Sequence, residues 1–472
     1  MKQILSLTTA SLLLVSLAAR AADPLVTVAP VVTVREREGI TGAGWAVATE
    51  RKITHIYPNH PDDWGKTGGT GLSYSDDGGQ TWKDGPDNSP LPGMVDMWQD
   101  RLRNGDLMTL GIRSVPNREK VLMAPATATS EYLVALSKDQ GKSWQTETAK
   151  LHCPSNLGVI ARPLPRIFED ERGALFMPAY SWAKTGNRAL LLKSGDRGRN
   201  WNIASVIADA QAIRASGAAL ASPWVETAVA RTSDGSWLAV VRTGSSAKSP
   251  LVTARSTDGG VTWSAVEKVL TGPQKRIAAG KLPGLCLLPN GVLVLLTAHT
   301  KNHCRIYLSP DGTGREWSDG IIITSQGGGN TSMICTGPDK LLIFTPANGR
   351  IQCWHVTITK GPPAAKGPLP APTDITVAGT KVGVSWKLPA NATTVSHYLV
   401  TPVLIKLSAD NKDTELYPYA PIRTRDAATQ LELGRVLSIG GTYRIEVAAV
   451  DREGRISPTA SSTELVVGAA TK

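Results

Sequence analysis

The residue types that first suggest chemistry are a carboxylate and a guanidinium on either side of one predicted turn. Glu226 lies nine residues before Gly235 and Arg242 lies seven residues after it, with mostly apolar residues between them. Two antiparallel strands joined at this turn bring both side chains to one edge of a sheet. Because a guanidinium offers two parallel N–H donors to a carboxylate, the pair predicts either a site for an acidic ligand or an ordinary ion pair at a sheet edge.

The same arrangement recurs at other turns along the chain. A dipeptide ending in glycine precedes a short apolar run at Asn104-Gly105, Arg172-Gly173, Asp234-Gly235 and Asn290-Gly291. Polar side chains stand nine residues before these glycines or seven to eight after them, at Asp96, Arg113, Tyr180, Glu226, Arg242 and His299. Equivalent ends of successive hairpins form a ring if the hairpins surround one axis. This predicts a ligand-binding mouth, to which Arg162 and Arg188 also belong.

One motif, S-x-D-x-G-x-[TSN]-W, recurs along the chain and explains why 13 tryptophans outnumber 9 tyrosines and 3 phenylalanines. Four copies run from Ser75 to Trp82, Ser137 to Trp144, Ser194 to Trp201 and Ser256 to Trp263, and a fifth with one extra residue runs from Ser309 to Trp317. We expect the aspartate to accept backbone N–H groups of a tight turn, glycine to supply positive φ and tryptophan to pack between neighbouring units. These residues are therefore predicted to be structural.

Each repeat is typical of a four-stranded meander, and six such units fit the chain. The sixth unit lacks the motif, but Cys286 and Cys304 recur as Cys335 and Cys353, both shifted by 49 residues. The segment from Val26 to Val34 is apolar and β-branched, and we expect it to close the ring. The predicted fold class is all-β, with a six-bladed β-propeller over residues 23–360.

The repeated motif resembles the Asp-box of the sialidase superfamily, where it joins the third and fourth strands of each blade on the side away from the active site. The segment from Glu226 to Arg242 resembles the sialidase segment in which a glutamate supports the nucleophile and an arginine clamps the substrate carboxylate. The resemblance implies these roles here. It also implies that Arg113 and Arg162 bind the carboxylate, with Asp96, His299 and Arg188 as further substrate-binding residues.

Two family positions are filled differently in this sequence. Sialidases carry Arg-Ile-Pro in the first blade, whereas the nearest match here is Arg166-Ile167 in the third unit. The family nucleophile is a tyrosine in the last blade, but residues 327–333 contain none. Tyr180 is then the available phenol, the alternative being a core tyrosine. A Tyr180–Glu226 pair predicts retention of anomeric configuration, and a carboxylate that activates water predicts inversion.

The resemblance places the general acid in the loop before the first Asp-box. Asp62 and Asp63 occupy that position, between Asn59 and Gly65. Either carboxyl is a candidate proton donor to the leaving oxygen, and the alternative is a solvated acidic turn.

The remainder of the chain predicts a second domain and an export signal. Residues 361–371 form a Pro/Gly-rich linker. Residues 372–472 alternate as sandwich strands do, with Trp386 and Tyr443 as core aromatics, and resemble an immunoglobulin-like fibronectin type III module. Residues 1–22 combine a charged start, a short apolar run and an A-x-A site, which predicts a signal peptide and a secreted or periplasmic protein rather than a lone membrane anchor.

The composition restricts the partners. A formal net charge of +11 favours anionic partners, and without a Lys/Arg run we expect an acidic oligosaccharide or glycoconjugate rather than nucleic acid. The five cysteines lack the spacing of a zinc site, and no carboxylate cluster predicts calcium, so we expect no metal and no cofactor. The sequence therefore predicts an exo-glycoside hydrolase that removes terminal acidic sugars. The alternatives are a non-catalytic propeller that binds acidic glycans and a glycosidase of different sugar specificity.

Overall fold

The computed structural model describes residues 25–37, 40, 42–50, 52–59, 69–85, 90–91, 96–114, 131–221, 224–244, 249–298, 303–325, 329–347, 349–360, 369–379, 381–388, 395–408, 417–434, 436–437 and 439–468. The regular secondary structure of these residues is almost entirely β-strand, which confirms the predicted all-β class; α2 (Ala210–Ala215) is a single short α-helix among them. Of the helices in these ranges, none has the length and hydropathy needed to cross a membrane. The predicted signal peptide lies outside the described residues.

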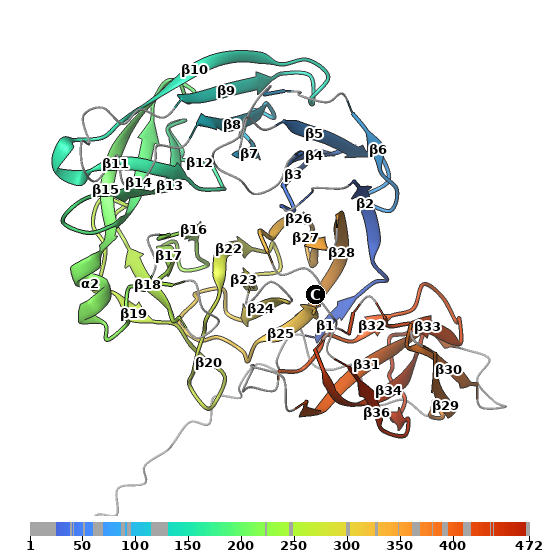
Figure 1. Cartoon of the computed structure of the whole chain (residues 1–472). Coiled ribbons are helices and arrows are strands. Elements are labelled where there is room, and N and C mark those ends of the chain that lie inside the picture. Colours follow the sequence, from blue (N-terminus) through green and yellow to red (C-terminus); the bar gives the residue numbers. More distant parts are fainter. Residues whose placement is uncertain are drawn as a thin grey trace, which may run out of the picture.

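Successive antiparallel sheets follow one another around a central axis (Figure 1). The first contains β3 (Trp45–Ala48), β4 (Ile53–Pro58), β5 (Thr70–Ser75) and β6 (Lys83–Asp84). The second contains β7 (Asp96–Arg101), β8 (Leu107–Ser114), β9 (Glu131–Ser137) and β10 (Gln145–His152). The third contains β11 (Val159–Pro163), β12 (Phe168–Glu169), β13 (Leu175–Trp182), β14 (Arg188–Ser194) and β15 (Asn200–Asp209), which also pairs in parallel with β10.

The second half of the ring repeats this plan. The fourth sheet contains β16 (Thr227–Arg231), β17 (Trp237–Arg242), β18 (Leu251–Ser256) and β19 (Glu267–Lys268), and a hairpin of β20 (Leu270–Thr271) and β21 (Arg276–Ile277) follows it. The fifth contains β22 (Lys281–Leu287), β23 (Leu293–Ala298), β24 (Cys304–Ser309) and β25 (Ile321–Thr324). The last contains β26 (Ser332–Gly337), β27 (Lys340–Ala347) and β28 (Arg350–Thr359).

The repeated motif forms the predicted turn between the third and fourth strands of its sheet. In the first copy, the Asp77 carboxylate accepts the backbone N–H of Thr81 at 2.9 Å and its hydroxyl at 2.6 Å, and the Gly79 N–H donates to Ser75 Oγ at 2.8 Å. The side-chain hydrogen bond from Thr81 is the largest cause of the lowered pKa of Asp77. Trp82 packs edge-on against Phe344 of the last sheet, as expected for a contact between units.

Strands from the start of the chain complete the last sheet. β1 (Leu25–Val28) and β2 (Val32–Glu36) both pair antiparallel with β28, so that Val28 lies opposite Val356 and Val32 lies opposite Cys353. The predicted closing role of residues 26–34 is therefore confirmed, with a break between the two strands. Apolar residues on both faces of these sheets form the core that lies between neighbouring units.

The C-terminal residues form two packed sheets. One contains β29 (Thr373–Ala378), β30 (Gly383–Lys387) and β33 (Gln430–Glu432). The other contains β31 (Val395–Leu407), β32 (Ile422–Arg423), β34 (Gly441–Asp451), β35 (Ala460–Ser461) and β36 (Leu465–Val467). Trp386 packs against Tyr398 with ring centroids 5.1 Å apart, and Tyr443 is fully buried. The two predicted core aromatics therefore lie in this core.

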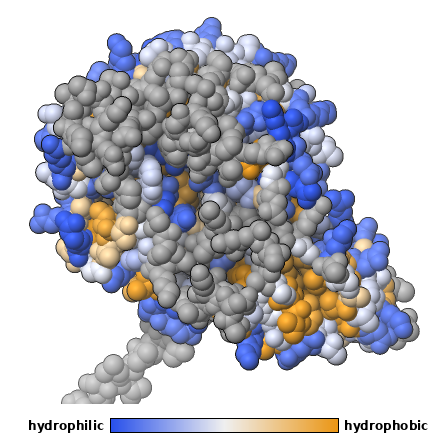
Figure 2. Space-filling model, viewed as in Figure 1, coloured by the Kyte–Doolittle hydropathy of each residue, from blue (hydrophilic) through white to orange (hydrophobic). Residues whose placement is uncertain are grey.

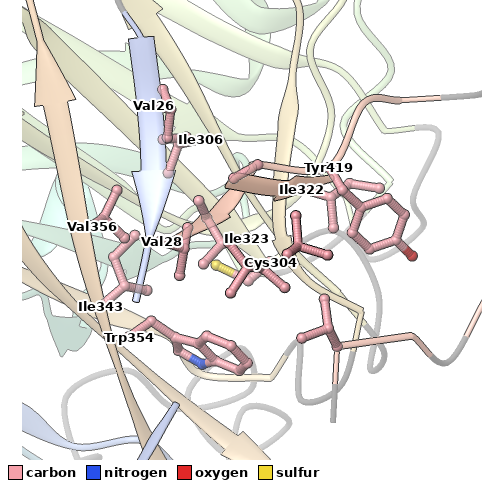
Figure 3. Packing of buried hydrophobic residues seen from close by; sticks show 14 of the residues in the cluster. Val26, Val28, Cys304, Ile306, Ile322, Ile323, Ile343, Trp354, Val356 and Tyr419 are labelled. Carbon is pink, nitrogen blue, oxygen red and sulfur yellow. The ribbon is translucent and has the colours of Figure 1, made fainter. Parts of the chain in front are cut away.

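The C-terminal sheet that contains β31, β32 and β34 continues the last sheet of the ring, which the sequence did not predict. β32 pairs in parallel with β1 at Val28 and Ile422. In addition, the Ile322 N–H donates to Pro418 O at 2.8 Å and the Ala420 N–H donates to Ile322 O at 2.9 Å. Figure 3 shows Val26, Val28 and Trp354 in one apolar cluster with Ile322 and Tyr419. The ring and the C-terminal module thus share a core.

Figure 2 shows hydrophilic residues over the visible rim of the ring and an apolar area over the C-terminal module.

Candidate functional site

The structure brings Glu226 together with two of the predicted arginines. Glu226 Oε2 lies 2.6 Å from Arg242 Nη1, and Glu226 Oε1 lies 3.5 Å from Arg162 Nη1. The three side chains are nearly buried, with 5%, 5% and 4% of the surface of Glu226, Arg242 and Arg162 exposed. Two guanidiniums therefore share one carboxylate at this place.

Glu226 and Arg242 are adjacent because of the hairpin that the sequence predicts. The Arg242 N–H donates to Glu226 O at 2.8 Å, which extends the pairing of β16 with β17 by one step. Arg242 Nε also donates to Gly244 O at 2.6 Å. These backbone contacts hold both side chains at the edge where β16 begins and β17 ends.

Neighbouring sheets supply the other contacts of the carboxylate. The Leu282 N–H, in β22 of the next sheet, donates to Glu226 Oε2 at 2.8 Å, and Leu282 adopts a φ of 42°. Arg162 comes from β11 of the preceding sheet, after a register shift between Ile160 and Arg162, and its guanidinium lies 5.8 Å from the ring centroid of Trp98. Sequence reasoning missed Leu282, whose contribution is a backbone group and leaves no residue-type signal.

Tyr180 lies near this cluster but is fully buried. It is the register partner of Arg162 in the pairing of β11 with β13. Its ring centroid lies 6.3 Å from that of Trp182 and 6.4 Å from that of Trp224, two residues before Glu226. The structure therefore places the phenol in an aromatic cluster, and its nucleophilic role stays a prediction.

Among the other predicted site residues, the side chain of Arg188 is described, and its printed contacts lie outside the Glu226 cluster. Arg188 donates to Gly186 O at 3.2 Å and to Thr185 Oγ1 at 2.8 Å, which are contacts within its own turn. Asp96 and Arg113 lie in β7 and β8, and the structure does not describe their side chains. Asp62, Asp63 and His299 lie outside the described residues. Their roles stay predictions.

A second polar group lies near the axis of the ring. Arg166, with a φ of 76°, reaches from the third sheet to the last, where its Nη2 donates to Met333 O at 3.2 Å. Asp100 of β7 accepts the Ile167 N–H at 2.9 Å. Burial raises the pKa of Asp100 to about 6, an effect that the charge of Arg166 partly opposes. A cavity of about 20 Å³ lined by Trp45, Arg166 and Met333 lies at this place.

A larger cavity lies elsewhere, at the junction of the ring with the C-terminal module. It measures about 550 Å³ and is lined by apolar residues, including Pro273, Trp317 and Pro418, with Lys275 and Lys360 among the charged ones. None of its lining residues belongs to the Glu226 cluster. Within the described ranges, no three His, Cys, Asp or Glu side chains are grouped as a metal site requires.

Comparisons with known proteins identify the repeats. Residues 120–333 match the model of the BNR repeat-like domain, and residues 73–84 match the model of the BNR/Asp-box repeat. The chain therefore contains BNR/Asp-box repeats, which agrees with the resemblance noted in its sequence. No curated protein matches the chain.

Several solved structures are similar. A Dyadobacter fermentans protein of unknown function has 18% identity and a TM-score of 0.52, covering 72% of this chain and 99% of its own. A Penicillium chrysogenum α-L-arabinanase complexed with arabinobiose has 14% identity and a TM-score of 0.50, covering 70% and 98%. A Trypanosoma rangeli sialidase in complex with 2,3-difluorosialic acid has 13% identity and a TM-score of 0.49, covering 95% and 92%. The first two show a shared fold.

Proposed function

We propose that this chain is a glycoside hydrolase on a BNR/Asp-box scaffold that removes a terminal sugar carrying a carboxylate. The observation that carries the proposal is the cluster in which Glu226 is shared by Arg162 and Arg242. A nearly buried site that gathers two guanidiniums favours an anionic ligand, because the guanidinium fork matches the two oxygens of a carboxylate. In this proposal Glu226 keeps the guanidiniums of Arg162 and Arg242 oriented and faces the reacting group of the bound sugar.

The blade number, the identity of the C-terminal module and the export signal in this proposal are taken from the sequence analysis. We take the six successive sheets as six propeller blades, residues 372–472 as a fibronectin type III module and residues 1–22 as an export signal for a secreted or periplasmic enzyme. The order of strands in each sheet supports the blades, and the two packed C-terminal sheets support the module.

A second function is a propeller that binds acidic glycans without cleaving them. The complete burial of Tyr180 favours it, because a nucleophile must contact the substrate. Turnover distinguishes the two functions.

The experiment is a glycoside panel assayed with the purified chain. It contains a fluorogenic sialoside, other acidic glycosides and neutral arabinosides, the last because a Penicillium protein of the same fold was solved with arabinobiose. We expect release of an acidic sugar. We also expect Arg242→Met to lower kcat/KM by about two orders of magnitude, the usual effect of removing one member of a buried charged pair. Arg199→Met is the matched control, because Arg199 pairs with Glu147 at an exposed position.

Each outcome of the panel has one meaning. Binding of acidic glycans without release of sugar supports the second function and rejects the hydrolase. Hydrolysis of neutral arabinosides alone supports the hydrolase and rejects the acidic substrate. Near-normal turnover by Tyr180→Phe would reject the tyrosine nucleophile, and an NMR assay of the anomer first released distinguishes retention from inversion.

A further inference from the structure

We propose that Cys286 and Cys335 form a redox-active pair that closes to a disulfide by exchange with a small-molecule disulfide, linking the fifth and last sheets of the ring. All five cysteines are thiols in the structure. The proposal does not depend on the hydrolase activity, because neither cysteine belongs to the Glu226 cluster.

The two cysteines lie on inner strands of neighbouring sheets. Cys286 is in β22 and Cys335 is in β26, at equivalent positions of the internal repeat. These strands approach each other closely, since a Cβ placed on Gly284 would lie 3.6 Å from Met333 Cε. The side chains of Cys286 and Cys335 interact with each other, and the Cys335 thiol donates a hydrogen bond to Gly337 O at 3.2 Å. Rotation about the side-chain bonds, with a small approach of the strands, is then the movement needed to join the sulfurs.

Arg166 supplies a positive charge beside both sulfurs. Its charge interacts electrostatically with Cys286 and Cys335, and its Nη2 donates a hydrogen bond to Met333 O at 3.2 Å. A neighbouring guanidinium favours the thiolate, which is the form that attacks a disulfide. The interaction with Cys286 is the largest cause that lowers the pKa of Cys335, and the interaction with Cys335 is the largest cause that raises the pKa of Cys286. In contrast, burial raises the pKa of Cys304 and of Cys353.

Exposure assigns the roles within the pair. Cys335 is half-buried, whereas only 3% of the surface of Cys286 is exposed. Cys335 is therefore the sulfur that a small molecule reaches first, and Cys286 is the resolving thiol. These two thiols are sufficient for the reaction, so no third cysteine has to take part.

The reaction is balanced by two exchanges. The Cys335 thiolate attacks one sulfur of the small disulfide RSSR, forms a mixed disulfide and releases one thiolate RS⁻. The Cys286 thiol loses its proton to this thiolate or to water and attacks Cys335 Sγ, which forms the Cys286–Cys335 bond and releases a second RS⁻. The two cysteines lose two electrons and two protons, and RSSR is reduced to two RSH.

The test uses the full chain and oxidised glutathione. After treatment and removal of the reagent, thiols are counted in denaturant, and non-reduced peptides are mapped by mass spectrometry. We expect the count to fall from five to three, with the Cys286 and Cys335 peptides joined. A count that stays at five, a stable glutathione adduct on the native chain or a bond between other cysteines would overturn the proposal.

Single variants test the two roles. Cys286→Ser should stop at one glutathione adduct on Cys335, because the resolving thiol is missing. Cys335→Ser should give neither an adduct on Cys286 nor a disulfide. Cys153→Ser is the matched control, because Cys153 is partly buried and directly follows β10 of the second sheet. This variant should still lose two thiols. Equal modification of Cys286 in the Cys335→Ser variant would contradict the assigned order.

Discussion

His55 should make the ring sensitive to acid. This histidine of β4 is fully buried, its Nε2 lies 2.6 Å from Ala43 O, and its ring stacks on Phe344 with centroids 4.8 Å apart. Among the residues that the structure describes, none is a hydrogen-bond partner of His55 Nδ1. The neutral ring therefore fits with its proton on Nε2, and a second proton on Nδ1 would be a buried donor without an acceptor.

The magnitude follows from the pKa. Burial is the largest cause that lowers the pKa of His55 from 6.5 to about 4, which the hydrogen bond to Ala43 partly opposes. A histidine whose pKa is lower in the folded than in the unfolded protein stabilises the fold fully above the unfolded pKa, and this stability is lost as the pH falls from 6.5 through about 4. At about 1.4 kcal/mol per pH unit, the loss reaches about 3 kcal/mol.

The assay is urea unfolding followed by tryptophan fluorescence at about pH 7.5 and about pH 4. His55→Gln keeps a donor for Ala43 O but does not titrate, so the variant should lose about 3 kcal/mol less free energy of unfolding than the native chain on acidification. His152→Gln is the matched control, because His152 is exposed and contacts Asn200. Equal losses in the native chain and in His55→Gln would refute the reasoning.

Two further predictions concern the stability of the ring. Glu226→Gln leaves Arg162 and Arg242 without their shared buried carboxylate, so the free energy of unfolding in urea should fall by about 3–5 kcal/mol, whereas Glu147→Gln, at the exposed pair with Arg199, should change it little. An unchanged urea midpoint for Glu226→Gln would contradict the role of the cluster. The Cys286–Cys335 disulfide closes a loop of about 49 residues and should raise the free energy of unfolding by about 4 kcal/mol, measured as the difference between oxidised and reduced chain in urea. Equal midpoints for the two forms would show that strain in the folded state offsets the gain.

The parts of the fold that depend on short-range contacts could be predicted from the sequence. The turn from Ser75 to Trp82 is held by hydrogen bonds within eight residues, so its spacing predicts its geometry. Glu226 and Arg242 meet because one hairpin sets their register, and this could also be predicted. Predicting these two features requires only the residues near each other in the sequence and the alternation of side chains along a strand.

Contacts between sheets could be predicted less well. Arg162 reaches Glu226 after a register shift in β11, and Arg166 crosses the axis from a residue with positive φ. The amino-acid types at these positions indicate neither the bulge before Arg162 nor the positive φ of Arg166. The pairing of β1 with β32 joins segments far apart in the chain, for which a single sequence offers no register.

The position of β1 has a consequence for how the chain is made. This strand leaves the ribosome well before β28 and β32, yet it lies between them in the folded sheet. Such distant pairing must await its partners and bears the entropic cost of closing a very long loop, so we expect closure of the ring to be a late and slow step of folding. Before Ile422 is synthesised, β1 can pair with β28, but the other edge of β1 stays open. Nascent chains stalled before Ile422 should therefore depend on chaperones that cover strand edges.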